Sequence, residues 1–227
     1  MSAFRRYLPT LILIVIAAVL LGIWVVFKIL TNEPLAVIED QQSEVKIGFQ
    51  VWSLNNLNVD HFRNGDPIPE AKTEGQWKAF SLAAEPAWCI CKMDSLGNEV
   101  DGKLYNFYAV NDRRGLAPEG WHVPSKDEWI ELMYSLGGEN RAGAKMKTTT
   151  DWPAESIGTN SSHFGGKPFC SRTSSGQFQS DTASVYWWSS SSEANETAWY
   201  SALTSSSFAL RGFSARGNGY AVRCIKN

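Results

Sequence analysis

The chain has 227 residues, and 21 Lys and Arg stand against 23 Asp and Glu, so its formal net charge is −2. The charges are interspersed without a basic excess, which argues against a nucleic-acid-binding protein. Ten Trp and 18 Gly fit a domain of short strands and long ordered loops, large enough to bury a core without a metal.

The N-terminus carries one long apolar stretch. No charged residue occurs from Tyr7 to Phe27, and about 20 helical residues span the ~30 Å hydrocarbon core of a bilayer. A soluble core helix would show a polar face, which this stretch lacks. We therefore expect a short tail at residues 1–6 and a transmembrane helix at 7–30 that contacts the lipid bilayer through Tyr7 to Phe27.

The residues around this helix favour its retention as a signal anchor. Trp24 and Phe27 occur where a signal-peptide cleavage site would have small residues. Arg5 and Arg6 precede the helix and only Lys28 follows closely, so the positive-inside rule places the N-terminus in the cytoplasm. The sequence predicts a single-pass membrane protein whose C-terminal domain is periplasmic or on the cell surface.

Beyond the anchor we expect a polar stalk at 31–45 and one domain at 46–227. The alternating residues 46–52 and the aromatic-rich residues 104–110 each predict a strand. Apolar residues within 73–83 predict a short helix.

The clearest helix signal follows an irregular linker at 115–124. Ser125 and Glu128 match a capping box, in which each side chain binds the other residue's backbone N–H. The apolar residues that continue at helical spacing are Trp129, Leu132, Met133 and Leu136, and Gly137 and Gly138 predict the end of the helix.

The C-terminal half divides into loop and strands. Residues 148–180 are mainly Ser, Thr, Gly and Asn with isolated aromatics, which predicts a long loop. Four strand-like runs, at 185–190, 197–203, 207–211 and 220–225, are separated by turn residues and predict an antiparallel meander.

Four cysteines in an exported domain predict two disulfides. Cys89 and Cys91 are two apart, so on a strand they point to the same face and are poorly placed to bond each other. Each is expected to pair with a distant partner, Cys170 or Cys224. The Cys-Ile-Cys spacing argues against zinc.

Oxygen ligands for a metal are harder to exclude. The stretch from Asp94 to Asp101 resembles a loose calcium loop, and Asp66 adds a carboxylate, but the EF-hand spacing is not met. A solvated acidic turn is favoured. We therefore expect no cofactor and no metal site, with a structural calcium as the open alternative.

A series of motifs runs nearly the length of the domain. They include QVWSLNNLNVD at 50–60, HFRNGDPIP at 61–69, GKLYNFYAV at 102–110, GLAPEGWHVPS at 115–125, YWWSS at 186–190 and VRC at 222–224. Each is weak alone, but their order is specific. Together they resemble the Fibrobacter succinogenes major paralogous domain family, which is common in surface and secreted proteins of Bacteroidetes.

That family is similar to formylglycine-generating enzymes and to C-type-lectin-like folds. The resemblance implies an α+β domain with a small antiparallel sheet, two main helices and long ordered loops. It also implies a bridge between Cys89 and Cys224. Cys91 and Cys170 stand where the family has an aromatic residue and Gly, so we expect these two to bond each other or else to remain free.

The residues offer little for catalysis. His122 resembles a packing position of the family, and His61 and His163 stand alone in loops. The formylglycine-generating relatives depend on two reactive cysteines near the C-terminus, where this chain has only Cys224. We therefore expect a protein that is not an enzyme.

The C-terminal segment combines aromatic and small polar residues, which is typical of binding loops. The candidate ligand-binding residues are Trp199, Tyr200, Ser205, Phe208, Arg211, Phe213 and Arg216. A core role is equally consistent with Trp187, Trp188 and Trp199. The leading hypothesis is a non-catalytic, membrane-anchored binding or adhesion module for a protein or glycan ligand. The alternatives are a structural component of a cell-envelope assembly and an enzyme related to formylglycine-generating proteins.

Overall fold

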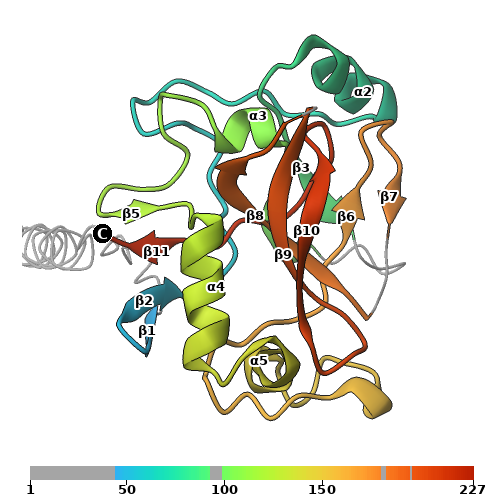
Figure 1. Cartoon of the computed structure of the whole chain (residues 1–227). Helices are drawn as coiled ribbons and strands as arrows, with labels where there is room; N and C mark the ends of the chain where they lie inside the picture. Colours follow the sequence, from blue (N-terminus) through green and yellow to red (C-terminus); the bar gives the residue numbers. More distant parts are fainter. Residues whose placement is uncertain (1–43, 93–98, 180–182, 195) are drawn as a thin grey trace, which may run out of the picture. The chain divides into compact units, whose positions relative to one another are not determined.

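The computed structural model describes residues 44–92, 99–179, 183–194 and 196–227 (Figure 1). The predicted tail and anchor, and the stalk up to residue 43, lie outside these ranges, as does most of the acidic stretch between Asp94 and Asp101. Within the described ranges, no helix has both the length and the apolar character needed to cross a membrane.

The described chain is α+β, as the sequence predicts, and its sheets are small and antiparallel. The helices are α2 (Glu74–Ala83), α3 (Phe107–Val110), α4 (Lys126–Ser135) and α5 (Glu139–Met146), with a 3-10 helix η1 at Ala154–Ser156. The strands are β1 (Glu44–Ile47), β2 (Gln50–Ser53), β3 (Trp88–Lys92), β4 (Glu99–Tyr105), β5 (Trp121–His122), β6 (Ser171–Arg172), β7 (Phe178–Gln179), β8 (Val185–Ser192), β9 (Thr197–Leu203), β10 (Ala209–Ala215) and β11 (Ile225–Lys226). The sheet orders are β1-β2-β11-β5, β10-β9-β8, β3-β4 and β6-β7.

Both predicted helices form; the cap predicted at Ser125 is confirmed, and Thr73 provides a cap that was not predicted. The Thr73 hydroxyl accepts a hydrogen bond from the Gln76 N–H at 3.2 Å, and the Gln76 side chain accepts one from the Thr73 N–H at 3.2 Å. Ser125 and Glu128 form the same reciprocal pair at the start of α4. The residues that α4 buries are Trp129, Leu132 and Met133.

The single strand predicted at 46–52 is a hairpin instead. Gly48 has a φ of +61° and occupies the first central position of a two-residue turn that pairs Ile47 with Gln50. Gly at this position is typical of a type II′ turn, whose twist suits a hairpin. The prediction of one strand was wrong because it did not weigh this turn signal.

The strand predicted at 104–110 is also interrupted. β4 ends at Tyr105, and Asn106 caps the short helix α3 by accepting from the Ala109 N–H at 3.0 Å. The same amide oxygen accepts from the Ala87 N–H at 3.0 Å. A side chain that satisfies backbone donors on both sides makes a turn more stable here than a continued strand.

Helix α5 was not predicted, because its eight residues include Gly143 and few large apolar side chains. Gly143 has a packing role: a Cβ at this position would collide with the backbone of Ser207 and Phe208. The Ala144 N–H donates to the Ser207 carbonyl at 3.1 Å. Gly143 therefore lets α5 approach the turn between β9 and β10 closely.

In the described part of the predicted loop, residues 148–179, the regular elements are η1, β6 and β7. Trp152 orders part of it by donating its indole N–H to the Gly166 carbonyl at 2.9 Å. The loop is therefore held in part by its own side chains, as long ordered loops commonly are.

The predicted meander forms from β8, β9 and β10, with α4 beside it and α5 near one of its ends (Figure 1). The last predicted strand does not continue it. Ile225 of β11 pairs with Trp52 of β2 and His122 of β5, so the C-terminus closes a different sheet.

The core forms two clusters, and strand alternation assigns side chains to them. On β8, Trp187 belongs to the first cluster and Trp188 to the second, and both are fully buried. Core roles are therefore confirmed for these two tryptophans. On β3, Cys89 and Cys91 both face the first cluster, as their spacing predicts.

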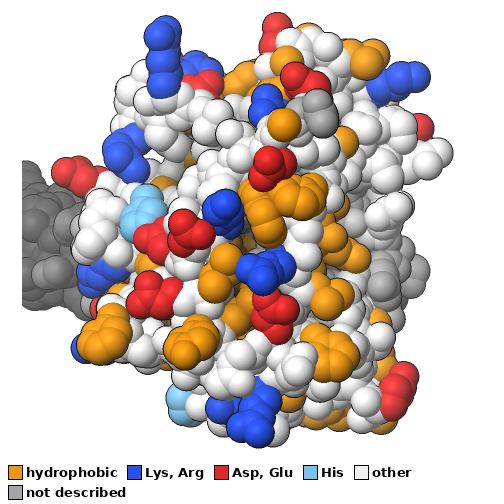
Figure 2. All heavy atoms as spheres, in the orientation of Figure 1, with side chains coloured by type: hydrophobic (Ala, Val, Ile, Leu, Met, Phe, Trp, Pro, Cys, Tyr) orange, Lys and Arg blue, Asp and Glu red, His pale blue; other side chains and the backbone are white. Residues whose placement is uncertain are grey.

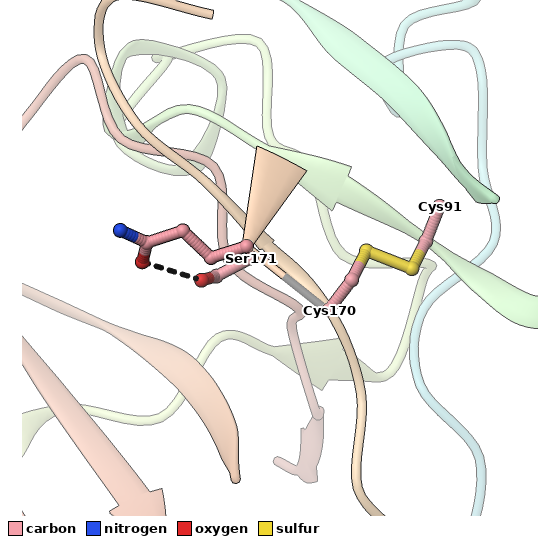
Figure 3. Close-up of a disulfide and its surroundings, with 4 residues drawn as sticks. Cys91, Cys170 and Ser171 are labelled. Atoms are coloured by element: carbon pink, nitrogen blue, oxygen red, sulfur yellow. Dashed lines mark hydrogen bonds between the residues drawn. A yellow bond between two sulfur atoms is a disulfide. The ribbon is translucent and has the colours of Figure 1, made fainter. Parts of the chain in front are cut away.

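Cys91 and Cys170 form a disulfide with a Cα–Cα distance of 6.1 Å, which confirms that predicted pair (Figure 3). Cys89 and Cys224 are free and buried, so the bridge implied by the family resemblance is not formed. The reason is that Cys89 lies in the first core cluster and Cys224 in the second. Burial raises the pKa of the Cys89 thiol to about 11 and that of Cys224 to about 12, so both are protonated at neutral pH.

Candidate functional site

The predicted ligand-binding residues do not form one patch. Successive residues of a strand point to opposite faces, and β9 and β10 therefore divide the set. One face of the meander carries Trp199, Arg211 and Phe213, and the other face carries Tyr200. The connection between β9 and β10 contains Ser205 and Phe208, and Arg216 follows β10.

Trp199 and Phe213 form an aromatic pair that we call the platform. They are direct cross-strand partners, with ring centroids 4.3 Å apart at 57°. The Trp199 indole N–H donates to a Glu193 carboxylate oxygen at 3.0 Å, and the Lys126 ammonium lies 5.4 Å from the indole centroid. The platform is therefore held in one orientation although Phe213 is 51% exposed.

Charged side chains surround the platform. On the same face, the Arg211 Nε lies 2.8 Å from a carboxylate oxygen of Glu139, at the start of α5. Figure 2 shows hydrophobic side chains over β10 with basic and acidic side chains next to them. This surface therefore offers apolar ring faces beside fixed hydrogen-bonding groups.

Tyr200 faces the other side and packs into a cluster of tyrosines. Its ring centroid lies 5.5 Å from that of Tyr186 and 5.6 Å from that of Tyr220. The Tyr220 hydroxyl lies 2.8 Å from the Ser214 hydroxyl. Burial raises the pKa of Tyr200 and of Tyr220, so both hydroxyls stay neutral. The contacts give Tyr200 a packing role, apart from the platform.

Ser205 and Phe208 are exposed in the β9–β10 connection. Lys147 anchors the backbone of this connection. Its buried ammonium donates to the Ser206 carbonyl at 2.6 Å and to the Ser156 carbonyl at 3.3 Å. The connection thus presents Phe208, which is 44% exposed, on an anchored backbone.

Arg216 points back toward the β8–β9 connection. Its guanidinium donates to the Glu193 carbonyl at 3.0 Å and the Thr197 carbonyl at 3.3 Å. It also lines an open pocket of about 820 Å³ with residues from 107–114. Sequence reasoning did not select those residues, because it assigned them to a strand and the loop after it.

The described residues contain no group of three or more His, Cys, Asp or Glu placed to hold a metal ion. Asp66 lies 3.2 Å from the Arg114 guanidinium instead. The ring nitrogens of His122 lie 2.8 Å from Glu128 and 2.7 Å from Asn227, which ties the C-terminus to α4. These contacts give His122 a structural role.

A comparison with protein families finds one match, described as the Fibrobacter succinogenes major domain, over residues 45–226. The matched range covers nearly all of the described strands and helices. No curated protein and no solved structure matches the chain.

Proposed function

The chain belongs to the Fibrobacter succinogenes major domain family, and from this premise we propose that it is a membrane-anchored, extracytoplasmic module that binds a glycan at the platform without catalysing a reaction. The observation that carries the proposal is the partly exposed aromatic pair, whose indole is fixed by Glu193. The anchor and the location rest on the apolar sequence from Tyr7 to Phe27.

The chemistry of a sugar matches this surface. A pyranose ring has an apolar face of C–H groups and a rim of hydroxyls. The C–H face can stack on Trp199 and Phe213, which would remove apolar surface from water. The hydroxyls can then bond to the charged side chains at the edge of the platform, of which Glu193 and Arg211 are already held by partners.

A protein partner suits the platform less well. Specific protein interfaces bury about 800 Å² on each partner, and charged residues are depleted at their centres. Here Lys126 and Glu193 contact the indole directly. Because the hydrogen bond to Glu193 orders the indole in advance, a small ligand loses less free energy to ordering on binding.

We further propose that the fold is C-type-lectin-like, as the family resemblance implies. Two features support this. Residues 148–170 are ordered without long regular elements, and the first and last segments of the described residues meet where β2 pairs with β11.

The test is a glycan array probed with the full chain in mild detergent. The double variant Trp199→Ala/Phe213→Ala should lose at least about tenfold in affinity, because both stacking surfaces are removed. The matched control is Tyr134→Ala, which removes an aromatic ring that is 83% exposed on α4 and should leave binding unchanged.

Circular dichroism of each variant checks that the fold is kept. The proposal fails if the wild type captures no glycan, or if the double variant binds as well as the control. A stable protein complex that survives purification and depends on the platform would support a component of an envelope assembly instead.

A further inference from the structure

The pocket beside Arg216 is a second feature, separate from the platform. Its walls come from the loop at 64–66, the end of α2, α3 with residues 111–114, and Arg216. Its volume of about 820 Å³ is within the range of small-molecule sites. Three guanidinium and two carboxylate side chains line it, so its net charge is +1.

One of these guanidinium groups is already paired with carboxylates. Arg114 makes two parallel hydrogen bonds of 2.9 Å to Asp112 and a third of 3.2 Å to Asp66. The hydrogen bond from Arg114 lowers the pKa of the Asp112 carboxyl. Hydrogen bonds from Asn64 and then from Arg114 lower the pKa of the Asp66 carboxyl. This closed network makes a rigid wall. The positive charge of Arg114 is already balanced by the two carboxylates, so Arg114 offers no net charge to a ligand.

Three other side chains that line the pocket have no hydrogen-bond partner among the described residues. Arg113 is exposed in the pocket and has no ion pair or hydrogen bond within the described ranges. The half-buried Tyr108 hydroxyl and the side-chain amide of Asn111 likewise have no hydrogen-bond partner among the residues described. Burial raises the pKa of Tyr108, so its hydroxyl stays protonated and can donate.

Arg216 adds a second guanidinium to the pocket. Its ion pair with Glu196 is 3.9 Å long, and the Glu196 side chain is 79% exposed, so this pair is weak. The pocket therefore combines one unpaired guanidinium, neutral donors, and a second guanidinium that has a weak ion pair and already donates to two backbone carbonyls. Such a set suits an anionic ligand that also carries many hydrogen-bonding groups.

We propose that the pocket binds a carboxylate-bearing sugar, a uronic acid residue. Arg113 holds the carboxylate through two parallel N–H donors, which is the geometry that arginine presents to carboxylates. Tyr108 and Asn111 bind the hydroxyls.

The single unpaired guanidinium suits a carboxylate better than a phosphate. Arg113 matches the one negative charge of a carboxylate, whereas the second charge of a phosphate would lose water without gaining another unpaired guanidinium. The polar walls also disfavour a purely apolar acid, since the Tyr108 hydroxyl and the Asn111 side chain would lose water without gaining a partner.

The experiment is calorimetric titration of the full chain in mild detergent with glucuronate and galacturonate. The comparison ligands are glucose, galactose, acetate and inorganic phosphate. We expect saturable uronate binding at least about tenfold tighter than the binding of any comparison ligand. Added salt should weaken it, because Arg113 is exposed to solvent.

Variants locate the site. Arg113→Gln should weaken uronate binding by about 10- to 100-fold and bring it to the level of the neutral sugars. Tyr108→Phe should have a smaller effect. The control Arg141→Gln removes an exposed guanidinium of α5 that has no partner among the described residues, and it should bind as the wild type does.

Trp199→Ala/Phe213→Ala should leave uronate binding intact, which separates this site from the platform. The proposal is overturned if uronates bind no tighter than neutral sugars, or if Arg113→Gln binds as the wild type does. Phosphate binding tighter than uronate would exclude the carboxylate, and acetate binding equally well would exclude the sugar.

Discussion

Arg223 shows how much one buried residue can organise. Its guanidinium is 3% exposed and donates to the Phe164 carbonyl at 2.6 Å and the Ser53 carbonyl at 3.3 Å. It also lies 4.3 Å from the Phe164 ring centroid. Burial lowers the pKa of Arg223 to about 9, so the side chain is still charged at neutral pH. It connects the C-terminal segment to the start of the domain and to the long loop.

Arg223→Met should therefore lower the free energy of unfolding by about 3 kcal/mol, because buried carbonyls lose their donors. Urea denaturation measures the change. Arg223→Lys should recover only part of it, since an ammonium cannot reproduce the planar fork of donors. Arg141→Met, on the surface of α5, should stay within about 0.5 kcal/mol of the wild type. Equal stability of the Arg223 and Arg141 variants would contradict this role.

At the scale of elements, the N-terminus of α4 depends on an ionised Glu128. Burial acts to raise the pKa of this carboxyl, but hydrogen bonds from Ser125 and His122 outweigh it and keep the pKa below its ordinary value of 4.5. The Ser125 N–H donates to the carboxylate at 2.7 Å and the His122 ring lies at 2.8 Å. A carboxyl whose pKa is lower in the folded state stabilises the fold above its unfolded pKa.

This contribution should be present above pH 4.5 and lost as the pH falls through the lower folded-state value. Melting temperatures measured from pH ~6 to pH ~3 should therefore fall more steeply for the wild type than for Glu128→Gln, which keeps a hydrogen-bonding side chain without the titration. Glu131→Gln, an exposed position one turn later, is the control and should follow the wild type. Parallel curves for all three proteins would show that Glu128 does not contribute.

At the scale of the whole molecule, the Cys91–Cys170 disulfide connects β3 to the segment before β6 across 79 residues. Closing a loop of this length restricts the unfolded chain and is worth on the order of 4 kcal/mol in the loop-entropy account. Cys91→Ala/Cys170→Ala should lose about that much stability in urea, and added reductant should then have no further effect.

The number of free thiols provides a second test of the Cys91–Cys170 disulfide. Alkylation of the denatured, non-reduced wild type should label two cysteines, Cys89 and Cys224, and labelling of the folded protein should be slow because both are buried. Complete resistance of the denatured protein to alkylation would instead indicate a second bridge.

Features set by nearby residues could be predicted from the sequence alone. The cap at Ser125 depends on hydrogen bonds three residues apart, and the meander of β8 to β10 depends on alternation and turns. The hairpin at Gly48 and the caps at Thr73 and Asn106 depend on equally local signals and could have been predicted in the same way.

Tertiary structure alone decided which distant side chains meet. The sequence identified all four cysteines, but Cys89 and Cys224 are kept apart because they belong to different core clusters. Strand pairing separated Tyr200 from Trp199 and Phe213, and it brought Arg216 beside Tyr108 and Arg113 in one pocket. Residue spacing and pattern determine local hydrogen bonds, whereas these contacts depend on how the whole core packs. The sequence by itself therefore determined the family and the α+β class, and packing decided which side chains form the platform and line the pocket.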